Sequence, residues 1–428
     1  MSQTINFSRR AAVASLGAAT LLAGCGRGPI GAALAGPSDP APARPSSVVT
    51  DNAGFDSFVA SFKNRAEGQG YPRTLLDRAF RGAGYMPDVI AKDRKQTEFT
   101  RTLEDYLAIA ASDERVKNGR AVFQRYSSTF SKIEARFGVD AKVVAAIWGM
   151  ESSYGVRRGS EPIVSAMATL AYDGRRRDFF TKQLYAVLKI LRAGDTTPEN
   201  MRGSWAGAMG HTQFMPTSYL AYAVDFTGDG RRDIWADDPT DALASAANYL
   251  KTFSWTKGQP WGVEVKLPGG FDLSKAGFSI KRSPADWAAM GVRDMNGGRV
   301  PNHGAARVIT PAGGGGPAFM VFSNFDVIKR YNNATSYAIG VGHLGDRIAG
   351  GGPIRGSFGP DPQGLTLEDR KDIQNRLTRK GFDTDGADGV IGAKSEAAIR
   401  AYEAANGLPS TGLATKALLI HLGGRPRG

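Results

Sequence analysis

Two stretches rich in glycine, proline and other small residues divide the 428-residue chain and limit how much of it can form a single core. They cover residues 26–52 and 350–364. Such composition is typical of flexible linkers. The sequence therefore predicts a tether over 26–52, one large body over 53–349, a Gly/Pro linker over 350–364 and a small module over 365–424.

Residues 1–25 have the pattern of an export signal, with two arginines before a short apolar run over 11–23. The run is too short to cross a bilayer, which needs about 20 residues. It ends in Leu-Ala-Gly-Cys25, which resembles a bacterial lipobox, where the cysteine becomes the lipidated first residue. We expect a periplasmic protein anchored by lipid to the outer membrane of a Gram-negative bacterium. The alternative is cleavage after Ala35, which gives a soluble periplasmic protein.

The net charge limits the classes of binding partner, and the scarcity of cysteine and histidine limits the kinds of catalytic and metal site. The formal net charge is +13, which attracts polyanions. Export makes nucleic acid an unsuitable partner and leaves an anionic cell-wall polymer. The single cysteine excludes a disulfide framework, and the four scattered histidines form no metal-binding cluster. The chemistry is therefore expected to need no cofactor, and we expect a monomer.

Hydrophobic periodicity indicates a mainly helical chain with a small β element. Apolar residues recur at helical spacing from Phe179 to Leu191, and Gly194 provides a stop. Asp238 and Pro239 suit the start of another helix. Strand-like alternation is confined to Val263–Leu267 and a short apolar run around Phe319.

A candidate catalytic carboxylate lies in the segment from Asp140 to Gly155. Asp140 can cap a helix whose apolar face carries Val144, Ile147 and then Glu151, near the helix end. Burial raises the pKa of a carboxyl group, which suits a general acid. The alternatives are a glutamate paired with Arg157 or Arg158, or one exposed at a fraying helix end.

A second segment, from Ser204 to Pro216, is rich in glycine and contains one amide side chain of interest. Gly207 and Gly210 permit a close approach of backbone to a ligand. Gln213 offers both a donor and an acceptor for sugar hydroxyl or N-acetyl groups. Taken alone, the segment could also be a structural turn before a helix.

Together, Glu-Ser-x-Tyr-Gly from Glu151 and Gly-Ala-Met-Gly-x-x-Gln-Phe-Met-Pro up to Pro216 resemble the lytic murein transglycosylases of the membrane-bound type B family. The resemblance covers residues 53–349 and implies a lysozyme-like domain that cuts the β-1,4 bond between N-acetylmuramic acid and N-acetylglucosamine. It implies a carbon–oxygen lyase in which Glu151 acts first as acid and then as base, giving 1,6-anhydromuramoyl ends. The alternatives are a hydrolytic muramidase and a non-catalytic wall-binding lipoprotein.

The resemblance also implies which side chains contact the glycan. Arg176 is expected to meet peptide or lactyl carboxylates. The positions that match cleft residues of the family are Tyr106, Ser204, Gln213, Tyr249, Tyr331, Asn332 and Tyr337. Tyrosines at helical spacing are alternatively core residues.

The segment from Asp225 to Asp233 resembles the first nine positions of an EF-hand calcium loop, with Thr227, Asp229 and Arg231 at alternate positions. It departs from that pattern at its third position, Thr227, and at its twelfth, which is alanine. The family resemblance implies closure of the site by Asp241 and a structural Ca²⁺. The alternative is an Asx-rich turn without an ion.

The module over 365–424 resembles the small three-helix peptidoglycan-binding domain found in wall hydrolases. Its order is a helix start at Thr366, a stop at Gly381, a glycine-rich loop around Gly389 and a second helix from Ala393 to Asn406. The resemblance implies binding to peptidoglycan strands, while the alternative is a generic helical bundle.

Overall fold

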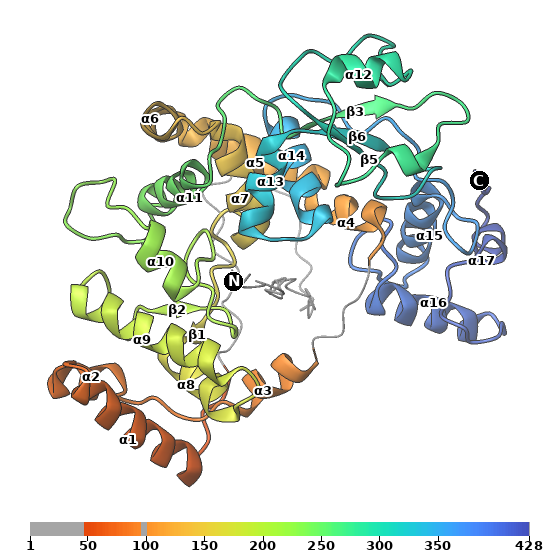
Figure 1. Ribbon diagram of the computed structural model, residues 1–428. Coiled ribbons are helices and arrows are strands. Elements are labelled where there is room, and N and C mark those ends of the chain that lie inside the picture. The colour runs from red at the N-terminus through yellow and green to blue at the C-terminus, as the bar shows by residue number, and fades with distance from the viewer. Residues whose placement is uncertain (1–46, 96–100, 428) are drawn as a thin grey trace, which may run out of the picture. The chain divides into compact units, whose positions relative to one another are not determined.

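The computed structural model describes residues 47–95 and 101–427, and these form two compact units (Figure 1). The first unit comprises residues 47–95 and 114–257, and the second comprises 101–113 and 258–427. Both units contribute residues to the range 53–349, because 101–113 group with the C-terminal part. The predicted export signal, Cys25 and most of the predicted tether lie outside the described residues. Within the described ranges, no helix combines the length and apolarity needed to cross a membrane.

The first unit is helical apart from one short antiparallel strand pair, in which Glu161 pairs with Gly203. Its elements are α1 (Ala53–Gly68), α2 (Arg73–Ala79), α3 (Pro87–Arg94), α5 (Asp113–Arg125), α6 (Ser127–Phe137), α7 (Ala141–Ser152), β1 (Glu161–Pro162), α8 (Ile163–Asp173), α9 (Arg177–Ala193), β2 (Arg202–Gly203), α10 (Pro216–Tyr222) and α11 (Thr240–Thr252).

The core of the first unit is built around α7 and α8. Residues 143–149 of α7 and 163–171 of α8 are buried without a break. Helices that are apolar on every side belong in an interior. The neighbouring helices shield them, with α6 and α11 against α7 and with α9 against α8. Glu151 therefore lies near the end of a helix, α7, that is packed on several sides by other helices.

The helix boundaries agree with the predicted start and stop signals, with one difference. Gly194 ends α9 in the left-handed region at φ 81°, and α11 begins directly after Pro239. Asp140 occupies the N-cap position of α7, but its side chain does not cap the helix. Its carboxylate accepts a hydrogen bond from Trp255 Nε1 at 2.8 Å instead.

Residues 47–52, assigned from the sequence to the tether, belong to the first unit and pack against the rest of it. Ser47 is buried, and its backbone N–H and hydroxyl both donate to the Glu161 carboxylate at 2.8 Å. Thr50 forms a β-bridge with Tyr85. The packed part of the chain therefore begins before residue 53.

The second unit contains a four-stranded antiparallel sheet in the order β4-β3-β6-β5. Figure 1 labels three of these strands, β3, β6 and β5. Trp287, Val308 and Phe322 lie fully buried in the core beside it. The sheet confirms the small β element predicted from the sequence. The elements are α4 (Leu103–Ala110), β3 (Gly262–Lys266), the 3-10 helix η1 (Leu273–Lys275), α12 (Pro284–Ala289), β4 (Arg293–Asp294), β5 (Arg307–Ile309), β6 (Ala318–Val321), α13 (Ser323–Tyr331) and α14 (Thr335–Ile348).

The C-terminal module of the second unit consists of α15 (Leu367–Arg379), α16 (Ala393–Ala405) and α17 (Lys416–His421). Thr366 and Asp369 form a reciprocal capping box at the start of α15. The three helices enclose their own core, to which Ile373, Ile399 and Leu419 contribute. The predicted fold class, mainly helical with a small β element and a three-helix terminal module, is confirmed.

The predicted linker over 350–364 has no helix or strand, as expected. Some of its residues nevertheless form hydrogen bonds and an ion pair with other parts of the second unit. The Glu264 carboxylate on β3 accepts backbone hydrogen bonds from Arg355 and Gly356 at 2.6–3.1 Å. Asp361 forms an ion pair with Arg370 of α15. Arg370 also forms an ion pair with Glu104 of α4. The module is therefore attached to the rest of the second unit by side-chain contacts as well as by the chain.

Candidate active site

Glu151 is the penultimate residue of α7 and is half-buried. The helix ends because the next residues turn left-handed, with φ of 50° at Ser153, 59° at Tyr154 and 88° at Gly155. Two consecutive non-glycine residues in this region are uncommon, and such strain gathers at functional sites. The Glu-Ser-x-Tyr-Gly motif thus specifies a sharp turn that ends α7, and Glu151 lies at the C-terminal end of this buried helix.

Ser152 and Gly155 stabilise the turn that ends α7. The Ser152 hydroxyl accepts from the Gly155 N–H at 3.0 Å and donates to the His211 carbonyl at 2.5 Å. A Cβ on residue 155 would lie 2.6 Å from the His211 ring, so glycine is required by space as well as by φ. The serine and the glycine of the motif therefore stabilise the turn that directly follows Glu151.

Tyr154 turns back into the unit. Its hydroxyl donates to the Arg115 carbonyl at 2.9 Å, and burial raises its pKa. A Cβ at Gly149 would lie 2.6 Å from the Tyr154 ring, so the small residue on α7 makes room for the tyrosine. This packing holds the strained turn in place.

Gln213 is half-buried and left-handed, with φ 52°. Its Nε2 donates to the Gly210 carbonyl at 2.8 Å and to the Arg158 carbonyl at 3.0 Å. Both amide protons are then used inside the unit. Oε1 is the atom of this amide that can still serve a ligand, as an acceptor.

Ser204 and Tyr249 both lie in the first unit with Glu151. The Ser204 hydroxyl accepts from the Ala208 N–H at 3.0 Å and closes the turn between them. The Tyr249 ring is half-buried and lies 4.8 Å from the rings of Tyr222 and Phe253. Tyr249 therefore belongs to an aromatic cluster, which positions its ring.

Arg176, which was predicted to meet a substrate carboxylate, forms an ion pair inside the first unit. Arg176 donates to the buried carboxylate of Asp93 at 2.6 Å, and Arg175 pairs with the same carboxylate. The guanidinium also lies 4.8 Å from the ring of Phe180. Although burial opposes ionisation, these two arginines hold the pKa of Asp93 below its usual range. These contacts fix the position of the Arg176 side chain, and its contact with substrate stays a prediction.

The other predicted sugar-contacting residues lie in the second unit. Tyr106 is half-buried on α4, and Tyr337 is buried on α14, which packs against α4. Tyr331 is the last residue of α13. Asn332 follows it, and its side chain accepts from the Ala334 N–H at 3.1 Å, which shapes the turn between α13 and α14.

The acidic loop brings Asp225, Asp229 and Asp241 together, with one carboxylate oxygen of each within 4.8 Å of the others. Asp225 accepts backbone N–H groups from residues 228–230, which lower its pKa against a desolvation penalty. Asp241 is buried on α11, and burial and the charge of Asp225 raise its pKa. The Thr227 hydroxyl donates to Asp225, and the Arg231 side chain pairs with Asp229. Repulsion between close carboxylates favours a bound cation at this place.

Comparison with known proteins identifies the family. The profile of the Transglycosylase SLT domain matches residues 54–346. The chain belongs to this transglycosylase family. A second profile, the putative peptidoglycan binding domain, matches residues 366–422, which contain α15, α16 and α17.

Three relatives of this transglycosylase-family chain are informative. Membrane-bound lytic murein transglycosylase B of Escherichia coli is 36% identical over 238 residues, which are 55% of this chain and 64% of that protein. SltB3 of Pseudomonas aeruginosa, crystallised with NAG-anhNAM-pentapeptide, is 45% identical and covers 87% of this chain and 100% of its own, with a TM-score of 0.70. Escherichia coli Slt35 in complex with calcium is 31% identical over 71% of this chain and 95% of its own, with a TM-score of 0.59.

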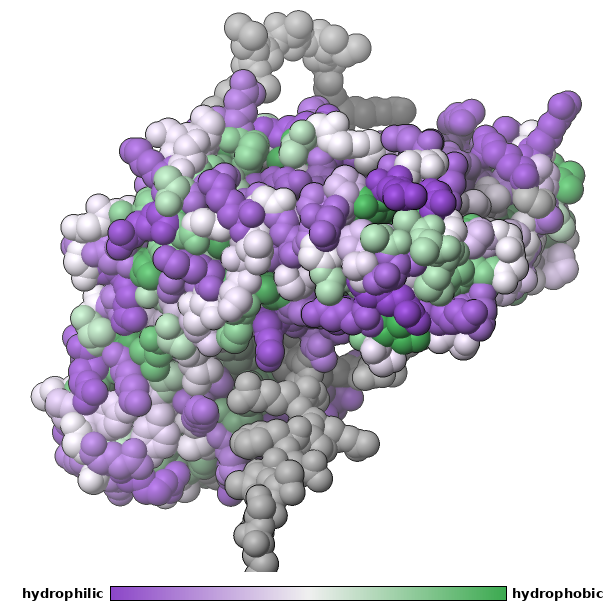
Figure 2. Space-filling view, turned by 45° about the horizontal axis from the view of Figure 1, so that its top comes forward, coloured by the Kyte–Doolittle hydropathy of each residue, from purple (hydrophilic) through white to green (hydrophobic). Residues whose placement is uncertain are grey.

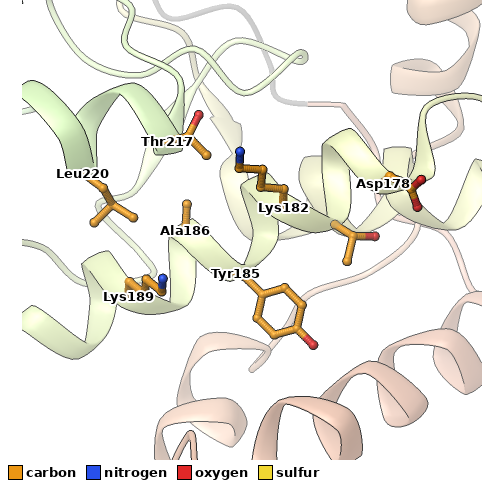
Figure 3. A pocket seen from close by; sticks show the side chains of 8 residues that line it. Asp178, Lys182, Tyr185, Ala186, Lys189, Thr217 and Leu220 are labelled. Atoms are coloured by element: carbon orange, nitrogen blue, oxygen red, sulfur yellow. The ribbon is translucent and has the colours of Figure 1, made fainter. Parts of the chain in front are cut away.

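A cavity of about 550 Å³ lies between α9 and α10, apart from the residues that the family motifs indicate (Figure 3). Asp178, Lys182, Tyr185 and Lys189 line it from α9, and Thr217 and Leu220 line it from α10. Neither Glu151 nor any of the predicted sugar-contacting residues is among its lining. The face drawn in Figure 2 is mostly hydrophilic, with hydrophobic residues in small groups between polar ones.

His211, for which the sequence indicated no role, is buried beside the helix end that carries the catalytic candidate. Burial lowers the pKa of His211 to about 4, and burial does the same to His343 in α14. The Arg158 charge lowers the pKa of His211 further, while its hydrogen bond to Ala236 and the carboxylates of Asp237 and Asp233 oppose the shift. The Trp148 indole on α7 contacts His211. The spacing of apolar residues along α7 could not predict this contact, because His211 lies in a distant part of the sequence.

Because both histidines have a lowered pKa, we expect the free energy of unfolding to fall in mild acid. Each is neutral in the folded protein but takes up a proton below about pH 6.5 when unfolded. Stability is therefore complete above pH 6.5 and falls towards pH 4, with each histidine costing roughly 2 kcal/mol between pH 7 and pH 5. Denaturant unfolding at pH 7, 6 and 5 measures this. A His343→Asn variant should show about half the dependence, and equal wild-type stability at pH 7 and pH 5 would contradict the prediction.

Proposed function

We propose that this chain is a lytic transglycosylase that cleaves the β-1,4 bond between N-acetylmuramic acid and N-acetylglucosamine in peptidoglycan. The observation that carries the proposal is the family match together with a 45% identical relative, SltB3, whose crystals hold an anhydro-sugar peptide. The position of Glu151 at the strained end of a buried helix supports its role as the proton carrier. The aligned region of the Escherichia coli relative spans 64% of that protein.

In the proposed reaction, one carboxyl group serves twice. Protonated Glu151 gives its proton to the glycosidic oxygen as the bond from that oxygen to muramoyl C1 breaks. The resulting carboxylate then takes the proton of the muramoyl C6 hydroxyl, whose oxygen forms a bond to C1. The products are a 1,6-anhydromuramoyl end and a free hydroxyl on the leaving sugar. No water is consumed, and Glu151 ends protonated for the next cycle.

This route needs no second catalytic carboxylate, whereas most glycosidases use a pair of them. Three acids follow Glu151 closely in the sequence, and each has another setting in the structure. Glu161 is buried and binds Ser47 and Lys92. Asp173 pairs with Arg94 at 2.6 Å, and Asp178 lines the cavity between α9 and α10. These contacts support a mechanism with an intramolecular nucleophile.

The C-terminal module is proposed to hold the enzyme on its insoluble substrate. Its support is the match of residues 366–422 to a peptidoglycan-binding profile. Attachment of a binding module raises the local concentration of the catalytic groups on the same polymer. The name of the membrane-bound Escherichia coli relative supports a location in the cell envelope. A lipid on Cys25 would anchor the chain there.

The acidic loop is proposed to bind a structural Ca²⁺ through Asp225, Asp229 and Asp241. The relative Slt35 was crystallised with calcium, and three close carboxylates suit a hard cation. Thr227 and Arg231 can contribute only a hydroxyl and backbone oxygens, since a guanidinium is no ligand. A bound cation would offset the burial and the Asp225 charge, which together raise the pKa of Asp241.

Calcium is therefore expected to raise the unfolding temperature by several degrees. A ligand at a hundredfold excess over its Kd stabilises the folded state by about 2.7 kcal/mol. Asp229→Asn should abolish most of the calcium-dependent rise. Asp272→Asn is the matched control, because both aspartates are exposed and accept a backbone N–H from two residues further on. Thermal unfolding with calcium and with chelator measures this, and an undiminished rise in Asp229→Asn would contradict the site.

The experiment that tests the function is mass spectrometry of the products from purified peptidoglycan. Anhydromuramoyl ends are the expected result. Reducing muramic ends would instead establish a hydrolytic muramidase, and the absence of any cleavage would establish a wall-binding protein without activity. The two kinds of cleavage product differ in mass, since hydrolysis adds one water that the anhydro product lacks.

A further inference from the structure

His211 is a buried side chain of the first unit that the proposed chemistry does not use. It is 4% exposed and lies in the glycine-rich segment of the family motif. Its ring is bonded on both sides: Trp148 Nε1 donates to Nδ1 at 3.1 Å, and Nε2 lies 2.7 Å from the carbonyl oxygen of Ala236. A histidine bound through both nitrogens is fixed in orientation.

These partners also fix the tautomer of His211. An indole N–H can only donate, so Nδ1 must be the acceptor. The ring proton is then on Nε2, which donates to the Ala236 carbonyl. Burial and the nearby Arg158 charge lower the pKa of His211 to about 4, so the ring is neutral near pH 7. The donor and acceptor pattern is therefore the same throughout the neutral range.

On one side, His211 holds the end of α7 at two points. Trp148 precedes Glu151 by three residues, and Ser152 follows it directly. The Trp148 indole binds the His211 ring, and the Ser152 hydroxyl donates to the His211 carbonyl at 2.5 Å. These contacts bracket the candidate acid in the sequence.

On the other side, His211 binds a segment that is anchored to the acidic loop. Asp233 accepts backbone hydrogen bonds from Trp235 and Ala236 at 2.9 and 3.0 Å. The Asp233 N–H in turn donates to the Asp241 carboxylate at 3.1 Å. A continuous series of hydrogen bonds therefore runs from Asp241 through Ala236 and His211 to α7.

We propose that His211 is a positioning residue that holds the proton-bearing end of α7 against the 233–236 segment. This inference rests on Glu151 as the acid of the proposed function. Displacement of a reacting group by about 1 Å can cost on the order of 100-fold in rate. Loss of the His211 contacts should therefore lower kcat and leave KM nearly unchanged, because the binding of substrate does not depend on the proton donor.

Four variants separate the two ring contacts. His211→Asn places an amide near Nδ1 and can keep the bond from Trp148, whereas His211→Gln places one near Nε2 and can keep the bond to Ala236. His211→Phe loses both, and Trp148→Phe removes only the indole donor. We measure kcat, KM and the pH profile of kcat on soluble uncross-linked glycan strands. The expected loss of kcat is about 10- to 100-fold for His211→Phe and smaller for the other three, with KM within twofold.

The matched control is His343→Asn, which removes another buried histidine whose pKa burial also lowers. It should lower the unfolding temperature without changing kcat or its pH profile. The proposal is overturned if the His211→Phe enzyme, folded by circular dichroism, keeps kcat within twofold of wild type, or, where that variant does not fold, if His211→Asn, His211→Gln and Trp148→Phe all do so. Failure of the proposed function is a separate result, since activity of Glu151→Gln would show it whatever the His211 variants do.

Discussion

Replacement of Glu151 by glutamine is expected to lower the release of soluble muropeptides by roughly 1,000-fold. Glutamine has the size of glutamate and keeps the helix end, but it can neither give a proton to the glycosidic oxygen nor take one from the C6 hydroxyl. Both half-steps of the proposed reaction are lost together. Acid–base catalysis by one positioned group accounts for about 10²- to 10⁴-fold in rate.

The control for this variant is Glu199→Gln, which changes an exposed glutamate of the same unit by the same atoms. It should keep full activity. Sedimentation with purified peptidoglycan should show equal binding of both variants, because the profile for wall binding covers residues 366–422. If Glu151→Gln retains more than a tenth of the wild-type rate, Glu151 is not the proton carrier.

The local features of the candidate site could be predicted because they depend on neighbours in the sequence. Apolar spacing placed Glu151 near the end of a helix, and the structure ends α7 at Ser152. A glycine stop and a proline start predicted the boundaries of α9 and α11. Each of these signals lies within a few residues of the feature that it determines.

The partners of polar side chains could not be predicted, because they come from distant parts of the chain. Asp140 has the right residue type for a helix cap, yet its carboxylate binds Trp255, 115 residues further on. Arg176 pairs with Asp93, 83 residues earlier, and no signal in the sequence indicated this ion pair. His211 attracted no prediction because its two ring partners, Trp148 and Ala236, are separated from it by 63 and 25 residues.

The division of the chain also depends on distant contacts. Residues 101–113 lie between helices of the first unit in sequence but belong to the second unit. Their helix, α4, packs against α14 and meets α15 through charged side chains. A linker composition over 350–364 predicted an irregular segment correctly but carried no information about such attachments.

Replacement of Arg370 by alanine is the second change for which we expect a large effect. The Arg370 side chain is 6% exposed and donates to three carboxylates, those of Glu104 at 2.7 Å, Asp105 at 3.0 Å and Asp361 at 3.2 Å. It also donates to the Gly389 carbonyl at 2.8 Å. Burial opposes its charge, but these acids hold its pKa above the ordinary value. Removal of Arg370 leaves three close carboxylates without their counter-charge.

Loss of one partner from a buried ionic group costs about 3–5 kcal/mol. For Arg370→Ala we therefore expect a lower free energy of unfolding and faster proteolytic cleavage within 350–364. The matched control is Arg400→Ala in α16, where an exposed pair with Glu396 should contribute no more than about 0.5 kcal/mol. Denaturant unfolding and timed proteolysis compare the two. Because Arg370 joins the C-terminal module to α4, the helix that carries Tyr106, equal behaviour of both variants would mean that the module is held by its chain connection alone.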